Sequence, residues 1–292
     1  MLADIAAVIA PIFVCAGIGM AWIWSGKAFN TEMVTEISFN LGIPCIIFST
    51  LTRLTVSTEA FAEMAAVYAI ATLGFLALGA IVLKLAGLPL TTFLPGQGFC
   101  NNGNMGLPLS LFAFGEQGLA YAISTFVISS IGSFTVGMGI YSGRPSWGLV
   151  WRNPIIYGLL LTLVFMVSGT KPPQWLSNTT QILGGVAIPM MLISLGVAMA
   201  RLKIAGFGRA LFLSVLRIGG GFAIGLAIAE IAGLHGAARG VLLMQSAMPV
   251  AVNNYLLAQR FNRNPSEVAG TVVVSTALSF ATLPLLLYFV LG

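Results

Sequence analysis

The chain carries one run of polar and helix-breaking residues inside an otherwise apolar stretch, NNGNMGLP at positions 101–108. Asparagine amides donate and accept hydrogen bonds without carrying a charge. Proline lacks an N–H and glycine weakens a helix, so this run cannot continue as a lipid-facing helix in which every amide needs a partner. At membrane depth such a run is tolerated where it is buried in protein or lines a cavity, and broken helices of this kind form the substrate sites of many transporters.

A second run of the same character, QSAMPVAVNN, occupies positions 245–254. A break at each place would expose the N-terminus of a half-helix, whose free amides and positive dipole end favour an anion. Two such ends meeting at mid-membrane would form a site for a carboxylate, unless the asparagines only satisfy backbone groups that the breaks release. The residues expected to line this site are Asn101, Asn102, Gly103, Asn104, Gly106, Pro108, Gln245, Ser246, Pro249, Asn253 and Asn254.

Composition places the chain in the membrane. Of its 292 residues 58% are hydrophobic and only 7% charged, with a mean hydropathy of +0.99, whereas a soluble domain carries roughly a quarter charged residues. The net charge of +5 would raise the question of nucleic acid in a soluble chain. Here the basic residues lie between apolar spans, so membrane orientation explains them and no nucleic-acid partner is expected.

Apolar segments long enough to cross a bilayer predict ten spans. They lie at about 4–25, 32–52, 60–84, 91–114, 118–141, 154–170, 179–200, 208–231, 237–259 and 268–291. Nine basic residues fall in the connections on one side, among them Arg144, Arg152 and Arg201, and three on the other, Arg53, Lys171 and Arg239. The positive-inside rule therefore predicts that the nine face the cytoplasm and that both termini lie outside.

Prolines recur at similar places in the two halves. Pro44 and Pro189 lie 145 residues apart, and Pro108 and Pro249 lie 141 residues apart, both close to half the chain length. Five spans per half is an odd number, so the halves must insert with opposite orientation. The sequence thus predicts an all-α membrane protein of two inverted repeats, residues 1–142 and 143–292, with spans four and nine broken.

Few other residues suggest chemistry. The sequence contains no HExxH, GxSxG, phosphate-binding loop or Cys/His cluster, so neither catalytic residues nor a metal or cofactor are expected, and the chain is not predicted to be an enzyme. Arg217 is the one basic residue well inside a span, with a substrate or gating charge weighed against a structural role. No acidic residue lies at mid-depth, where sodium and proton carriers usually have one, which puts cation coupling in doubt.

The motif NNGNMGLPL, with its partner MPVAVNNYLLAQRF, resembles the auxin efflux carrier family, and the short link between spans five and six resembles that of bacterial members. The resemblance implies a fold similar to the bile-acid sodium symporters, with spans four and nine crossing at their breaks. It also implies a transport domain of spans 3–5 and 8–10 against a scaffold of spans 1, 2, 6 and 7.

By this resemblance the chain would be a secondary carrier in the inner (plasma) membrane for a small organic anion, either an auxin-like monocarboxylate or a malate- or malonate-type dicarboxylate. A channel or an ion-coupled symporter for another small solute is the alternative. The expected partners are the anion and the lipid bilayer. Substrate, direction, coupling ion and oligomeric state, including a homodimer, stay open.

Overall fold

The structure, a computed structural model, describes residues 2–53, 57–144, 148, 151 and 153–291, whose regular secondary structure consists of helices, without a strand. Labels η denote π-helical segments within longer helices. The elements are α1 (Leu2–Trp24), α2 (Thr31–Ile37), η1 (Ser38–Gly42), α3 (Ile43–Arg53), α4 (Thr58–Leu85), α5 (Leu90–Gly98), η2 (Asn102–Gly106), α6 (Leu107–Gly132), η3 (Ser133–Gly137), α7 (Met138–Ser142), α8 (Pro154–Ser168), α9 (Gln174–Arg201), α10 (Phe207–Val215), η5 (Leu216–Gly220), α11 (Gly221–Ile231), α12 (Gly236–Ser246), α13 (Val252–Arg260) and α14 (Pro265–Leu291).

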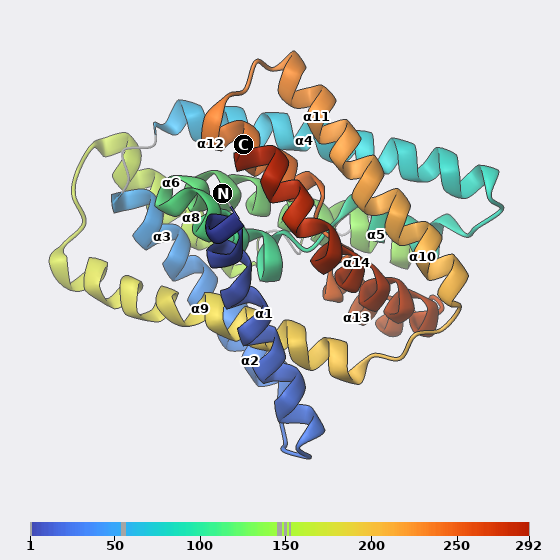
Figure 1. Cartoon of the computed structure of the whole chain (residues 1–292). Coiled ribbons are helices and arrows are strands. Elements are labelled where there is room, and N and C mark those ends of the chain that lie inside the picture. Colours follow the sequence, from blue (N-terminus) through green and yellow to red (C-terminus); the bar gives the residue numbers. More distant parts are fainter. Residues whose placement is uncertain (1, 54–56, 145–147, 149–150, 152, 292) are drawn as a thin grey trace.

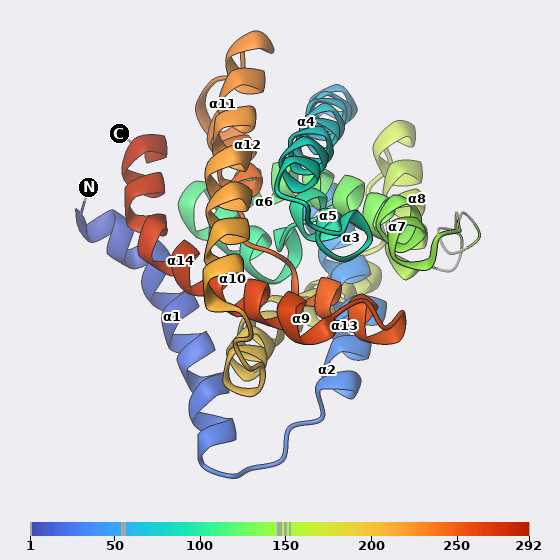
Figure 2. The ribbon, with the colours of Figure 1, turned by 90° about the vertical axis from the view of Figure 1, so that its right-hand side faces the viewer.

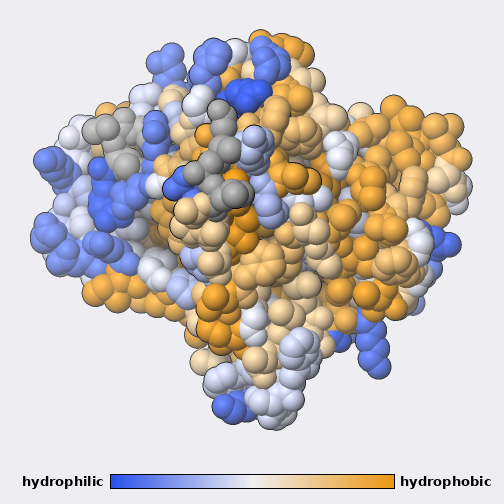
Figure 3. All heavy atoms as spheres, viewed as in Figure 1, coloured by the Kyte–Doolittle hydropathy of each residue, from blue (hydrophilic) through white to orange (hydrophobic). Residues whose placement is uncertain are grey.

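Seven helices in the described part of the chain are long and apolar enough to cross a membrane. Their outward faces carry large apolar side chains, including Ile70, Leu73, Ile81, Ile182 and Leu285, each more than half exposed. Figure 3 shows apolar residues covering the centre of one face, over α10, α11 and α14, with hydrophilic residues gathered at its left edge. A surface of this kind is stable in lipid, so the chain is an all-α integral membrane protein.

Fewer long helices than the ten expected spans are found because several segments are interrupted. The pieces α5, α12 and α13 have 9, 11 and 9 residues, and α8 has 15. The range of α6 likewise contains two helices, which meet at a kink at Gly115, whose φ of 63° and ψ of −155° are non-helical. Only glycine adopts that conformation without strain.

Local sequence signals explain the helix ends. The side chains of Asn30, Ser57 and Asn153 accept hydrogen bonds from the first turns of α2, α4 and α8, and Pro154 opens α8. Gly169 ends the same helix in the left-handed conformation, before the sequence Lys171-Pro172-Pro173. Pro145, Trp147 and Arg152, in the expected link between the halves, lie outside the described residues.

The helices pack around a central core to which both halves contribute. Helix α9 packs along α1 and α3, α3 packs on α8, α10 lies along α14, and α4 packs on α5 and α6. In Figure 1, α4 crosses the top of the view and α9 the bottom. The two chain ends lie near each other in Figures 1 and 2, and α1 contacts α14.

The first break precedes Pro108. Residues 99–101 are non-helical, and Pro108 lies inside the half-helix that begins with η2 at Asn102 and continues as α6. The second break, residues 247–251, does contain Pro249. The spacing of 141 residues therefore pairs a proline inside a half-helix with one inside a break.

Candidate functional site

The two interrupted helices meet at their breaks. Residues 99–101, between α5 and η2, run antiparallel to residues 247–251, between α12 and α13, and Cys100 pairs with Val250 in an isolated bridge. Four half-helix ends therefore converge: the C-termini of α5 and α12, and the N-termini of η2 and α13. Each C-terminus carries partial negative charge and each N-terminus partial positive charge.

Side chains and backbone hold the crossing together. The Asn101 N–H donates to the carbonyl oxygen of Pro249 at 2.8 Å, and Asn254 Nδ2 donates to the carbonyl oxygen of Phe99 at 3.0 Å. Asn254 is 2% exposed, and its Oδ1 has no hydrogen-bond partner in the described structure. These bonds satisfy carbonyl groups that the breaks release.

Asn102 occupies the centre of a buried polar network. Its Nδ2 donates to Gln245 Oε1 at 2.6 Å, and its Oδ1 accepts from Tyr68 OH and from Cys100 Sγ, each at 3.1 Å. Gln245 Nε2 in turn donates to Ser110 Oγ at 3.1 Å. Asn102 and Gln245 are fully buried, so this pair links η2 to α12 as a structural tie.

Four further expected site residues pack inside the protein. Gly103, Gly106 and Pro108 are buried in η2 and α6, and a Cβ atom at Gly106 would collide with the side chain of Gln245. Ser246 is also fully buried, and its hydroxyl has no partner among the described residues. Their role here is close packing at the crossing.

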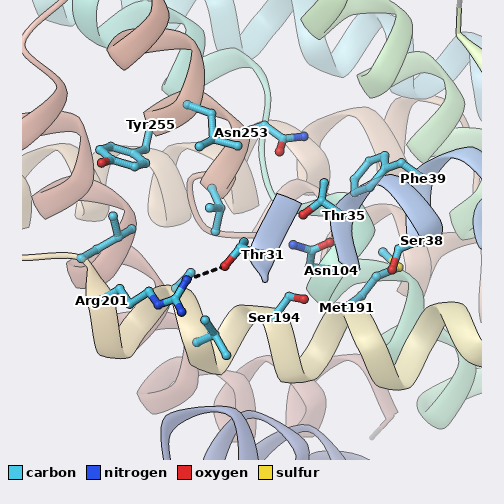
Figure 4. A pocket seen from close by; sticks show the side chains of 15 residues that line it. Thr31, Thr35, Ser38, Phe39, Asn104, Met191, Ser194, Arg201, Asn253 and Tyr255 are labelled. Carbon is cyan, nitrogen blue, oxygen red and sulfur yellow. Dashed lines mark hydrogen bonds between the residues drawn. The ribbon is translucent and has the colours of Figure 1, made fainter. Parts of the chain in front are cut away.

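A cavity of about 260 Å³ adjoins the crossing. It lies between η2 and α13 on one side and α2, η1 and α9 on the other (Figure 4). Of the expected site residues, Asn104 and Asn253 line it, and both are half-buried. Along α9 its lining extends from Met191 to Arg201, about 15 Å at 1.5 Å per residue.

A second, smaller cavity of about 40 Å³ lies directly against the first break. It is lined by residues 101–104, by Asn253 and by the hydroxyl residues Ser129, Ser130 and Ser133. Asn101 is 3% exposed, and its Nδ2 has no hydrogen-bond partner in the described structure. Since Asn104 and Asn253 line both cavities, the two spaces adjoin at these amides.

Six polar residues that line the larger cavity were not expected from the sequence: Thr31, Thr35, Ser38, Ser194, Arg201 and Tyr255. Arg201, at the end of α9, donates to Thr31 Oγ1 at 2.7 Å and to the carbonyl oxygen of Phe29 at 2.8 Å. Ser194 lies two turns earlier on the same face and has a buried hydroxyl without a partner in the described structure, and Thr35 faces it from α2 (Figure 4). In the sequence, the sign of this arrangement is the spacing of Ser194 and Arg201, which places both side chains on the same face of one helix.

The electrostatics of the larger cavity favour an anion. The N-termini of η2 and α13 carry no side-chain cap, and of their first-turn N–H groups those of Asn102 and Asn254 donate to the backbone carbonyl oxygens of Cys100 and Ala251. The hydrogen bonds of Arg201 go to neutral oxygens, and no acidic residue of the described chain lines either cavity. Arg217 lines neither cavity, so its positive charge does not lie at the surface of either one.

Similarity to known proteins agrees with this architecture. Residues 145–287 match the family described as "Membrane transport protein". An uncharacterized transporter of Methanocaldococcus jannaschii is 25% identical over 283 residues, which covers 89% of this chain and 89% of that protein. Another uncharacterized transporter, from Methanothermobacter thermautotrophicus, is 26% identical over 63% of each chain.

Plant carriers are similar over a shorter stretch. Auxin efflux carrier component 1 of Arabidopsis thaliana is 28% identical over 153 residues, half of this chain and 24% of the plant protein. The match thus spans about a quarter of the plant carrier's length. Together with the membrane-spanning helices, these similarities show a membrane transporter that is similar to the auxin efflux carriers.

Proposed function

We propose that this transporter carries a small organic carboxylate anion, bound where the N-termini of η2 and α13 meet the larger cavity. The observation that carries the proposal is the placement of Asn104 and Asn253 beside two uncapped helix N-termini in a cavity of about 260 Å³. This volume is close to the lower end of small-molecule sites, roughly 300–1,000 Å³. An anion gains from the amides and dipole ends, while a cation meets no described acid there.

The lining suits a carboxylate with an apolar body. Phe39, Met191, Val197 and Leu256 contribute apolar surface, and the polar groups gather at the helix N-termini and at Arg201. A monocarboxylate such as an auxin would use the helix ends for its charge and the apolar wall for its body. A dicarboxylate would use Arg201 as well, so both classes stay within the proposal.

We also propose the ten-span, inverted-repeat arrangement, with halves 1–142 and 143–292. The termini lie side by side, as an even number of spans requires (Figure 2). In this arrangement α4–α7 and α10–α14 form the transport domain, and α1–α3, α8 and α9 form the scaffold. The larger cavity lies between these two sets of helices, which supports an elevator-like movement of one against the other.

A direct test of the anion site compares a carboxylic acid with its methyl ester. We expect the acid that binds best among mono- and dicarboxylates to raise the melting temperature, since a ligand at about 100 times its Kd stabilises by roughly 2.7 kcal/mol. The ester should bind at least about tenfold more weakly, because a hydrogen bond to a charged group contributes about 1.5–3 kcal/mol. Equal binding of acid and ester would exclude a site built for an anion.

Flux measurements in proteoliposomes separate a carrier from a channel. A carrier saturates with substrate and is accelerated by substrate on the far side. Flux that rises linearly and shows no such acceleration would favour the channel.

The proposed orientation, with both termini outside, predicts the labelling of single cysteines. In a chain with Cys15→Ala and Cys45→Ala, the remaining Cys100 is buried and serves as the background. We expect Arg144→Cys to react with an impermeant maleimide only after the membrane is opened, and Lys171→Cys to react in intact cells. The reverse pattern would invert the topology and place the larger cavity on the outer side.

A further inference from the structure

Arg217, in η5, is the largest buried side chain that the proposed anion site leaves unused. It is 2% exposed, so it does not extend to the membrane surface. Its Nη1 donates to the carbonyl oxygen of Gln97 and its Nη2 to the carbonyl oxygen of Ser246. A structural role, one of the two alternatives that the sequence left open, is the one these contacts favour.

These two carbonyl groups lie at equivalent points of the crossing. Gln97 is the penultimate residue of α5, and Ser246 is the last residue of α12. Both are carbonyl groups that a helix C-terminus leaves without an intrahelical partner. Each C-terminus is equivalent to about half a negative charge, so two of them together match one guanidinium.

Among the described residues, no acidic side chain forms an ion pair with Arg217. The guanidinium carbon lies 4.3 Å from the centroid of the Phe75 ring, a cation–π contact. A void of about 10 Å³ adjoins the side chain, room for a single water at most. No described acidic residue lines this void.

In carriers with broken helices, half-helix C-termini and unwound carbonyl groups coordinate the coupling Na⁺ or H⁺. Here the guanidinium of Arg217 already occupies that position. No group of three or more His, Cys, Asp or Glu that could hold a metal ion occurs among the described residues. We propose that the guanidinium of Arg217 takes the place of a coupling cation. The two helix C-termini at the crossing then have their positive counter-charge without sodium, and transport proceeds without sodium.

In this proposal, which rests on the proposed carrier function, Arg217 is a positioning residue. It draws the C-termini of α5 and α12 together, and this leaves the opposite ends, the N-termini of η2 and α13, aimed at the anion. The positive charge is covalently part of the protein and moves with the two half-helices. A sodium gradient therefore supplies no driving force at this site.

The test compares purified wild type, Arg217→Lys and Arg217→Gln in sodium chloride and in choline chloride of equal concentration. Arg209→Gln is the matched control, since Arg209 lies two turns earlier and pairs with Glu267 at the surface. We expect the melting temperatures of wild type and control to be the same in both salts. Arg217→Gln should melt lower than the control in choline and be stabilised by sodium, whereas Arg217→Lys should keep most of the wild-type stability in both.

Uptake into proteoliposomes should follow the same order, with at least about a tenfold loss for Arg217→Gln in choline. Wild-type stability or uptake that requires sodium overturns the proposal, as does an Arg217→Gln variant that sodium does not stabilise. If that variant does not fold, the test rests on wild type and Arg217→Lys, whose melting temperatures and uptake should be the same in sodium chloride and in choline chloride. The melting measurements need no substrate, so a failed carboxylate assay would refute the carrier function and leave this result standing.

Discussion

Replacing Asn102 with alanine is expected to lower the free energy of unfolding by about 2–3 kcal/mol. In a fully buried site, the change leaves Gln245 Oε1 without its partner and leaves Tyr68 OH only the weak sulfur contact with Cys100 Sγ at 3.4 Å. An orphaned buried group costs about 1–3 kcal/mol, and single hydrogen bonds between membrane helices average only about 0.6 kcal/mol. Two orphaned groups at the lower end of the first range give the expected value, measured by thermal or denaturant unfolding in detergent.

Asn104→Ala is the matched control for this measurement. It removes the same side chain two residues along η2, at a half-buried position that lines the larger cavity. We expect Asn104→Ala to keep wild-type stability and to weaken carboxylate binding. If the two variants were equally stable, Asn102 would not be the structural tie that its contacts indicate.

Replacing Arg201 with alanine is expected to weaken carboxylate binding about 10- to 100-fold. Arg201 places a positive charge in the larger cavity, and its present hydrogen bonds go only to a hydroxyl and a carbonyl group. A charge-assisted hydrogen bond contributes about 1.5–3 kcal/mol, which corresponds to this range. Arg201→Lys should lie between wild type and alanine, because lysine keeps the charge and loses the planar fork.

Lys203→Ala controls for a general loss of positive charge near the membrane. Lys203 is exposed two residues beyond Arg201 and lines neither cavity. Isothermal titration or a melting shift with the best carboxylate measures both variants. An equal loss for Lys203→Ala would mean that the effect is long-range attraction and not contact in the cavity.

The sequence predicted the broken helices well because such runs of residues are not tolerated in a helix that faces lipid. Asparagines, glycines and prolines at membrane depth require buried or cavity-lining backbone, and both runs do lie at the crossing. The likeness to the auxin efflux carriers followed from the same residues and the helical membrane fold from the composition, and both are confirmed. The number of spans and the inverted repeat stay predictions.

What the sequence could not supply was the direction of each side chain within the crossing. Asn102 and Asn104 differ in no local property, yet one is fully buried against α12 and the other faces the larger cavity. That difference depends on where η2 meets α9 and α12, which begin 68 and 130 residues after the end of η2. Arg201 was counted as a cytoplasmic charge for the same reason, since its proximity to Thr31 spans 170 residues.

The contact between α1 and α9 determines which wall of the larger cavity is able to move. A Cβ atom at Gly19 would collide with the carbonyl oxygen of Ile193, and one at Gly196 with that of Ala16, so the two helices touch backbone to backbone. Such a contact has no side chains that could change rotamer to permit sliding. Helix α9, with Met191 and Arg201, is therefore held against α1, and in the proposed transport movement the cavity changes its shape through the opposite wall, η2 and α13.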